Sequence, residues 1–378
     1  MNLTILKENF IEGLKIIERV VGKNLTLPIL NNVLISTEKN FLNLSATDLE
    51  LGIKYWSLVK IEKEGKITIP IKILSNFINF LPDKKITLET KNQVLYINCE
   101  NNKTQIKGLN AEEFPIIPRI ENKEYLELNT SVFCDGFSQV VDFSTPNQTR
   151  PELSGIYLNF QKDRVQLTAT DSFRLAEKTL YLEKKTDKEC SFILPQKTVR
   201  EFVNIFSEKK GKIKLYFSPN QVLFEYPMAD FSHPQVQIIS RLVEGEYPDY
   251  QGIIPKKYSI QITLSRNDFL NQVKAASLFS GKINEVKLKI NPKKDGIEIF
   301  SQNPEYGENK NFLEGKVNCN PDTTEKEASF NFKFLIDGLL NIKSQKVVFE
   351  LNGEDDPAVL KPAGDSSYIY VLMPIKSS

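Results

Sequence analysis

The stretch Leu44-Ser45-Ala46-Thr47-Asp48 decides how this chain is organised, because it recurs later as Leu167-Thr168-Ala169-Thr170-Asp171. A second segment, Lys85-Ile86-Thr87-Leu88, recurs as Lys212-Ile213-Lys214-Leu215, and a weaker third copy has Ile297-Glu298-Ile299-Phe300 and Lys346-Val347-Val348-Phe349. The copies lie about one third of the 378 residues apart. Self-similarity at a fixed period is typical of duplicated structural units. We therefore predict one domain repeated three times.

Each copy shows the same order of elements, which begins with an amphipathic helix of 3.6-residue period. In the first copy the apolar positions are Leu6, Phe10, Leu14, Ile17 and Val21. Ser131 and Ser265 are candidate N-caps, and second helices are expected near Pro70, Pro195 and Phe332. Strands with two-residue alternation fill the rest. The pattern predicts an α+β fold with two helices and roughly eight strands per copy, the helices covering one face of antiparallel sheet. Predicted domains are 1–120, 121–255 and 256–378.

Composition excludes several classes of protein. Hydrophobic residues make up 40% and charged residues 26%, as in an ordinary globular protein. The chain shows neither a signal peptide nor an apolar run long enough for a membrane, so we expect a cytoplasmic protein. Its four cysteines are too widely spaced for a metal or redox motif, and no cofactor is expected. With a net charge of +1, contact with nucleic acid would require basic residues gathered locally.

Two other classes of function remain open on these observations. For an enzyme, the sequence offers a single histidine, His233, which we expect in an exposed loop. Asp48 and Glu50 would share one strand face as paired carboxylates, but the repeated Thr-Asp pair also suits a turn at a strand end. No glycine-rich phosphate loop is present. A β-rich scaffold module would instead bind through exposed sheet edges.

Over its whole length the chain resembles the bacterial sliding clamp, the beta subunit of the replicative DNA polymerase. The resemblance rests on several motifs that occur in order: Leu25-Thr26-Leu27-Pro28-Ile29-Leu30, Thr47-Asp48-Leu49-Glu50, Thr170-Asp171-Ser172-Phe173-Arg174-Leu175, Leu242 to Tyr250, and Tyr370-Val371-Leu372-Met373-Pro374-Ile375. It implies a non-catalytic protein whose three clamp domains form a crescent. Two crescents would close into a six-domain ring around double-stranded DNA and tether the polymerase to its template.

The resemblance also implies a groove that takes short peptide motifs of the polymerase catalytic subunit, the clamp loader and repair proteins. The residues that it assigns to this groove are Leu153, Thr170, Ser172, Phe173, Arg174, Leu175, Pro248, Gly252, Ile253, Val371, Leu372, Met373, Pro374 and Ile375. Three of them depart from the family pattern. Ser172 and Phe173 stand where Gly and His are usual, and Gly252 stands where a basic residue is common.

Basic residues on or near the expected helices are our candidates for DNA contact, and they are Lys23, Lys72, Arg150, Lys197, Arg200 and Lys274. Diffuse attraction to phosphates would hold the duplex without reading its sequence. For the seam of the homodimer, the resemblance assigns Ile106, Leu278 and Phe279. Thr104 stands there in place of a larger apolar residue.

Overall fold

The computed structural model describes residues 1–22, 26–120, 124–145, 149–187 and 189–376. These residues form two compact units, each of which combines segments from two repeats. The first unit contains Met1–Cys134 and Lys197–Leu242, and the second contains Asp135–Gln196 and the chain from Val243 onward. No helix among the described residues is long and apolar enough to cross a membrane.

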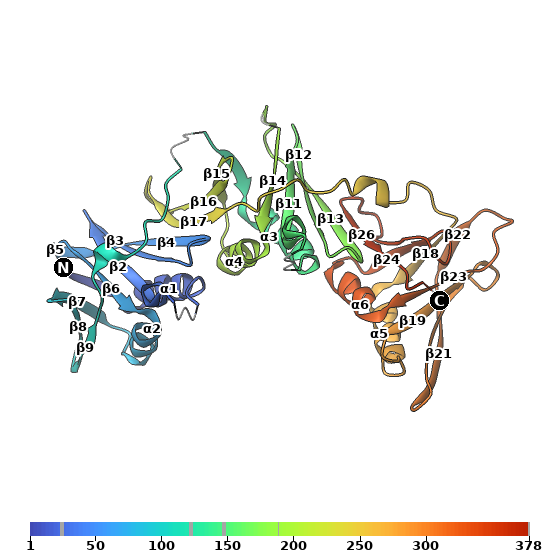
Figure 1. Ribbon diagram of the computed structural model, residues 1–378, viewed down its shortest axis with the longest axis horizontal. Coiled ribbons are helices and arrows are strands. Elements are labelled where there is room, and N and C mark those ends of the chain that lie inside the picture. The colour runs from blue at the N-terminus through green and yellow to red at the C-terminus, as the bar shows by residue number, and fades with distance from the viewer. Residues whose placement is uncertain (23–25, 121–123, 146–148, 188, 377–378) are drawn as a thin grey trace. The chain divides into compact units, whose positions relative to one another are not determined.

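The first unit holds a five-stranded and an eight-stranded sheet, both of which consist of antiparallel pairs (Figure 1). The smaller sheet has the order β5 (Lys60–Lys63), β1 (Asn2–Leu6), β7 (Lys85–Lys91), β8 (Val94–Cys99) and β9 (Asn102–Lys107). The larger sheet has the order β10 (Leu126–Asn129), β15 (Lys212–Ser218), β16 (Gln221–Pro227), β17 (Pro234–Arg241), β4 (Leu51–Leu58), β3 (Phe41–Thr47), β2 (Asn32–Glu38) and β6 (Lys66–Pro70).

The second unit holds a nine-stranded and a four-stranded sheet. The larger sheet has the order β14 (Cys190–Pro195), β11 (Gly155–Phe160), β12 (Arg164–Thr170), β13 (Arg174–Tyr181), β26 (Tyr368–Leu372), β25 (Ala358–Pro362), β24 (Lys346–Leu351), β18 (Ile260–Ser265) and β22 (Lys316–Cys319). The smaller sheet has the order β21 (Gly307–Glu314), β20 (Gly296–Asn303), β19 (Glu285–Asn291) and β23 (Lys326–Asn331).

The described residues form two α-helices in each repeat, which confirms the predicted number of helices per copy. They are α1 (Lys7–Glu18), α2 (Ile71–Phe80), α3 (Thr130–Val140), α4 (Gln196–Phe206), α5 (Arg266–Ser277) and α6 (Phe332–Asn341). The buried face of α1 carries Phe10, Leu14 and Ile17, as the helical period predicts. In the first unit α1 packs against α2, β3 and β4, and in the second α5 packs against α6 (Figure 1).

Details at the helix starts differ from the prediction. Ser131 lies inside α3, because the helix already begins at Thr130, and Asn129 instead accepts a hydrogen bond from the Val132 amide. Ser265 occupies the N-cap position of α5 but makes no capping hydrogen bond. Pro70 is the last residue of β6 and the N-cap residue of α2, so this helix begins where it was predicted.

The largest sheets continue across repeat boundaries, which the sequence analysis did not predict. β17 of the central repeat pairs with β4 of the first, and Ile239 lies opposite Gly52. β26 of the third repeat pairs in the same way with β13 of the central one, and Val371 lies opposite Leu175. The strands of the central repeat are therefore divided between the two units.

The Thr-Asp pair forms a turn at a strand end in both repeats, as the sequence predicted. The Asp48 carboxylate accepts hydrogen bonds from the Glu50 and Leu51 amides, and the Asp171 carboxylate accepts them from Phe173 and Arg174. Each turn contains one residue with positive φ, Leu49 at 80° and Ser172 at 77°, a strained conformation that the side-chain bonds stabilise. The turn also shows that Asp48 and Glu50 do not share a strand face.

His233 lies in the loop directly before β17, as predicted, but it is not fully exposed. Its imidazole is partly buried and stacks on Phe41 with ring centroids 4.0 Å apart, while Trp56 approaches edge-on at 5.6 Å. The histidine therefore packs against side chains of β3 and β4.

Candidate functional site

A cavity of about 310 Å³ lies in the second unit, where β13 pairs with β26. The turn after β12 borders it, and so do two short 3-10 helices, Pro151–Ser154 and Gln251–Ile253. Leu175 and Val371 form its floor together with Tyr250, and all three are nearly inaccessible to solvent. Strand pairing thus brings together apolar residues that are far apart in the sequence.

Nine of the fourteen residues assigned to the groove line this cavity: Leu153, Thr170, Ser172, Arg174, Leu175, Pro248, Ile253, Val371 and Met373. Thr170 is fixed at the strand end, where its hydroxyl donates to the Arg174 carbonyl at 2.6 Å and accepts from the Ser172 amide at 3.1 Å. Met373 is held beside β13 because its amide donates to the Phe173 carbonyl at 2.9 Å. The backbone therefore positions both walls of the cavity.

The other five assigned residues do not line it: Phe173, Gly252, Leu372, Pro374 and Ile375. Leu372 is fully buried, because successive side chains of β26 point to opposite faces of the sheet. Phe173 is 62% exposed and its ring stacks on Phe334, 6.3 Å away. Gly252 faces open space. Beyond the cavity, the Ile375 amide donates to the Ser329 carbonyl at 2.8 Å.

Three further residues line the cavity without having been assigned to it: Arg150, Asp249 and Tyr250. Arg150 was predicted to contact DNA, but it borders the cavity and pairs with Glu152 at 3.1 Å. Tyr250 donates to the buried Glu177 carboxylate at 2.5 Å. Burial, and after it the charge of Glu177, raises the pKa of the Tyr250 hydroxyl well above its usual value, so the hydroxyl remains a donor. The sequence signal that could have assigned Tyr250 to the cavity is its position directly after the Tyr-Pro-Asp motif.

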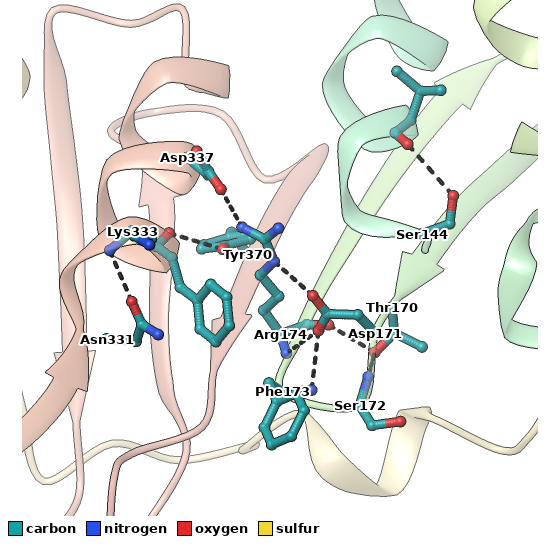
Figure 2. Close-up of polar contacts among 12 residues, drawn as sticks. Ser144, Thr170, Asp171, Ser172, Phe173, Arg174, Asn331, Lys333, Asp337 and Tyr370 are labelled. Carbon is teal, nitrogen blue, oxygen red and sulfur yellow. Dashed lines mark hydrogen bonds and ion pairs between the residues drawn. The ribbon is translucent and has the colours of Figure 1, made fainter. Parts of the chain in front are cut away.

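Arg174 links the turn after β12 to α6 (Figure 2). Its Nε donates to Asp171 at 2.9 Å and its terminal nitrogen pairs with Asp337, while the guanidinium lies 4.5 Å from the Phe334 ring centroid. Burial lowers the pKa of Arg174, but Tyr370, Asp337 and Asp171 together raise it above its usual value. The guanidinium thus remains charged, and carboxylates of the protein already occupy two of its nitrogen atoms.

The basic residues proposed for DNA contact lie on three helices and one loop. Lys72 is exposed on α2, Lys197 and Arg200 are exposed one turn apart on α4, and Lys274 is exposed in the last turn of α5. Lys197 forms an ion pair with Asp48. Lys23 lies outside the described residues.

The residues assigned to a seam differ in their exposure. Ile106 lies on the edge strand β9 but is only 7% exposed, whereas Leu278, directly after α5, is 74% exposed. Phe279 is partly exposed. The high exposure of Leu278 excludes a position in the core at the end of α5.

No group of three or more His, Cys, Asp or Glu side chains within the described ranges is placed to hold a metal ion.

The repeated α+β fold and the apolar cavity are features of a protein that binds other molecules in a concave site. Comparison with known proteins identifies the family. Models of the N-terminal, central and C-terminal domains of the DNA polymerase III beta subunit match residues 1–118, 127–249 and 251–376. The chain therefore belongs to the DNA polymerase III beta subunit family, the sliding clamps of bacteria.

Individual relatives match along their whole length. The beta sliding clamp of Staphylococcus aureus is 29% identical over 387 residues, with all of both chains covered. The structure of the Bacillus subtilis sliding clamp aligns with a TM-score of 0.93 at 25% identity over all of both chains. The clamp of Pseudomonas aeruginosa, in a structure bound to griselimycin, aligns with a TM-score of 0.92 at 23% identity, again over all of both chains. The protein is accordingly a non-catalytic clamp of DNA replication, in agreement with the function expected from its motifs.

Proposed function

We propose that the cavity beside β13 and β26 receives a short apolar peptide through which the polymerase catalytic subunit, the clamp loader and repair proteins attach to the clamp. The observation that carries this proposal is the largely apolar lining, with Leu175 and Val371 on paired strands and Met373 directly after β26. Concave apolar sites with a few placed polar groups are typical of ligand binding. The flexible thioether of Met373 suits a site that accepts several partners.

Binding of a fluorescent clamp-motif peptide tests this proposal. Truncating both Leu175 and Met373 to Ala removes apolar contact area, and we expect affinity to fall by about tenfold or more, since each lost methylene contributes about 0.8 kcal/mol. Leu340→Ala is the matched control, because Leu340 is 54% exposed on α6 and does not line the cavity. Unchanged affinity in the double variant would contradict the proposal.

We further propose that two copies of the chain close into a ring around double-stranded DNA in the cytoplasm, with Lys72, Lys197, Arg200 and Lys274 attracting the phosphates. Their exposure on helices supports this role, since sequence-independent binding requires accessible cations. After loading by its clamp loader, the protein should remain on nicked circular DNA and leave when the circle is cut. Retention that does not depend on circularity would contradict encirclement.

The seam of this ring would include Ile106, Leu278 and Phe279. A large exposed apolar side chain such as Leu278 supports an interface position. Leu278→Asp should shift the protein from dimer to monomer in size-exclusion chromatography with light scattering, because the interface would bury an unpaired charge. Persistence of the dimer at the same concentration would exclude Leu278 from the seam.

A further inference from the structure

The first unit carries a second concave region, on the face of the eight-stranded sheet opposite α1. On β4, Tyr55 points toward α1 and its hydroxyl lies 3.2 Å from Glu12, so the alternate residues Gly52, Lys54 and Trp56 face the other side. Two hollows of about 420 and 410 Å³ lie there, and both are lined by Lys54, Trp56 and Arg119. We call the two hollows together the β4 trough.

Hydrogen-bond donors without acceptors gather in the β4 trough. Asn43 is 9% exposed, and its Nδ2 donates to none of the described residues, although its Oδ1 accepts from Ser45 at 2.6 Å. Lys54 and Arg119 form no ion pair with a carboxylate in the part of the chain that the structure describes. Burial, and after it the charge of Arg119, lowers the pKa of Lys54. These groups would all be stabilised by an anion placed among them.

Carboxylates at the border of the β4 trough limit what that anion can be. Glu38 and Glu112 line one hollow, where Glu112 pairs with Lys66 at 2.7 Å. In the other hollow Glu225 accepts from Gln237 at 2.8 Å and lies 3.8 Å from Lys214. Their negative charges would repel a continuous row of phosphates but leave room for one carboxylate near the unpaired donors. A nucleic acid is therefore disfavoured as the occupant.

Apolar side chains line both hollows of the β4 trough, and they belong to one cluster along its floor. Leu223 and Ile239 line one hollow, and Leu34, Phe114 and Ile117 line the other. The arrangement is complementary to a chain that presents one acid together with neighbouring apolar groups. We propose that the β4 trough binds a peptide segment of a partner protein in which one Asp or Glu is flanked by apolar residues.

Trp56 makes the proposal directly measurable, because it is the single tryptophan of the chain and lines both hollows. The probe is the capped peptide acetyl-Ser-Ile-Val-Asp-Val-Ile-Ser-amide, titrated into the full-length protein while Trp56 fluorescence is recorded. We expect a saturable change, and binding at least about tenfold weaker when the central Asp of the peptide is replaced by Asn, since charge-assisted hydrogen bonds are stronger than neutral ones.

Variants of the protein test the donors one by one. Lys54→Met should weaken binding of the Asp peptide by about tenfold and Arg119→Met by about fivefold, in proportion to the burial of each cation. Lys85→Met is the charge control, because Lys85 is exposed on β7 in the other sheet of this unit, and it should bind as the parent does. Thermal unfolding of each variant verifies that it is folded.

Other outcomes would overturn the inference. Equal affinity for the Asp and Asn peptides, or undiminished binding by Lys54→Met, would exclude the anion contact. Inorganic phosphate that binds as tightly as the peptide would reduce the β4 trough to a simple anion site. The variant with Leu175 and Met373 truncated should keep the fluorescence change, because those residues belong to the other cavity, so failure of one proposal leaves the other intact.

Discussion

The segment 113–117 packs on β4 in the first unit, and the equivalent segment 246–250 packs on β13 in the second. We call these two contacts the first and the second joint, and they differ in their packing. At the first, Gly52 leaves space that Ile117 fills, and a Cβ built on Gly52 would lie 2.8 Å from the Cγ2 of Ile117. At the second, the equivalent residue is Leu175, and Tyr250 packs beside it on the cavity floor. The comparison teaches that a duplicated joint acquires a polar or an apolar hollow through very few substitutions.

Among exchanges of equivalent residues between the two joints, replacement of Arg174 by Leu should have the largest effect on stability. Arg174→Leu introduces the equivalent of Leu51 and leaves Asp171 and Asp337 without their cation. We expect a loss of about 2–4 kcal/mol in the free energy of unfolding, because a poorly solvated carboxylate remains unpaired. Denaturant unfolding followed by circular dichroism measures it. The companion variant Asp337→Asn should lose much less free energy of unfolding, since Asp337 is 42% exposed. A loss larger than that of Arg174→Leu would contradict this explanation.

The reciprocal exchange, Gly52→Leu, should destabilise the first joint by about 1–3 kcal/mol, because it overpacks the space that Ile117 occupies. Combining it with Ile117→Ala should restore part of the stability, since the smaller side chain makes room. Trp56 fluorescence reports unfolding of this unit. Stability equal to that of the parent for Gly52→Leu alone would mean that the joint is not closed by contact of Ile117 with Gly52.

Exchange of Tyr250 for Ile, its equivalent in the first joint, should cost about 1–3 kcal/mol, because the buried Glu177 loses its hydrogen-bond donor. The variant Tyr250→Phe isolates that hydrogen bond from the packing of the ring. Both variants are compared with the parent by thermal unfolding. If Tyr250→Phe were as stable as the parent, the hydrogen bond would contribute nothing and packing alone would hold the floor.

The smallest effect is expected for Lys54→Met, which should stabilise the free protein by about 0.5 kcal/mol. Burial and Arg119 lower the pKa of Lys54, so the folded state binds fewer protons than the unfolded state between the lowered pKa and about 10.4. Stability of the parent then rises with pH through that interval, and the advantage of Lys54→Met shrinks. Unfolding curves at pH 7 and pH 10 measure this change, and an advantage that grows with pH would contradict it.

The repeat allowed the helices and the Thr-Asp turns to be predicted from the sequence, whereas the residues that line the cavity were indicated by the family resemblance. Leu175, Val371 and Met373 were recognised because the motifs around them are continuous in the chain. Leu372 belongs to the same motif but does not line the cavity, because a motif does not state which face of a strand each residue occupies. The pairing of β4 with β17 could not be predicted, since strand partners distant in the sequence are set by tertiary packing.

Division of the central repeat between two sheets has a consequence for any attempt to dissect this protein. Cutting the gene at a repeat boundary would separate β4 from β17 or β13 from β26 and strip a long strand of its neighbour. An open strand edge of this kind invites pairing with other chains. Fragments that follow the repeats should therefore aggregate, and the smallest piece that remains well behaved should retain both members of each pair.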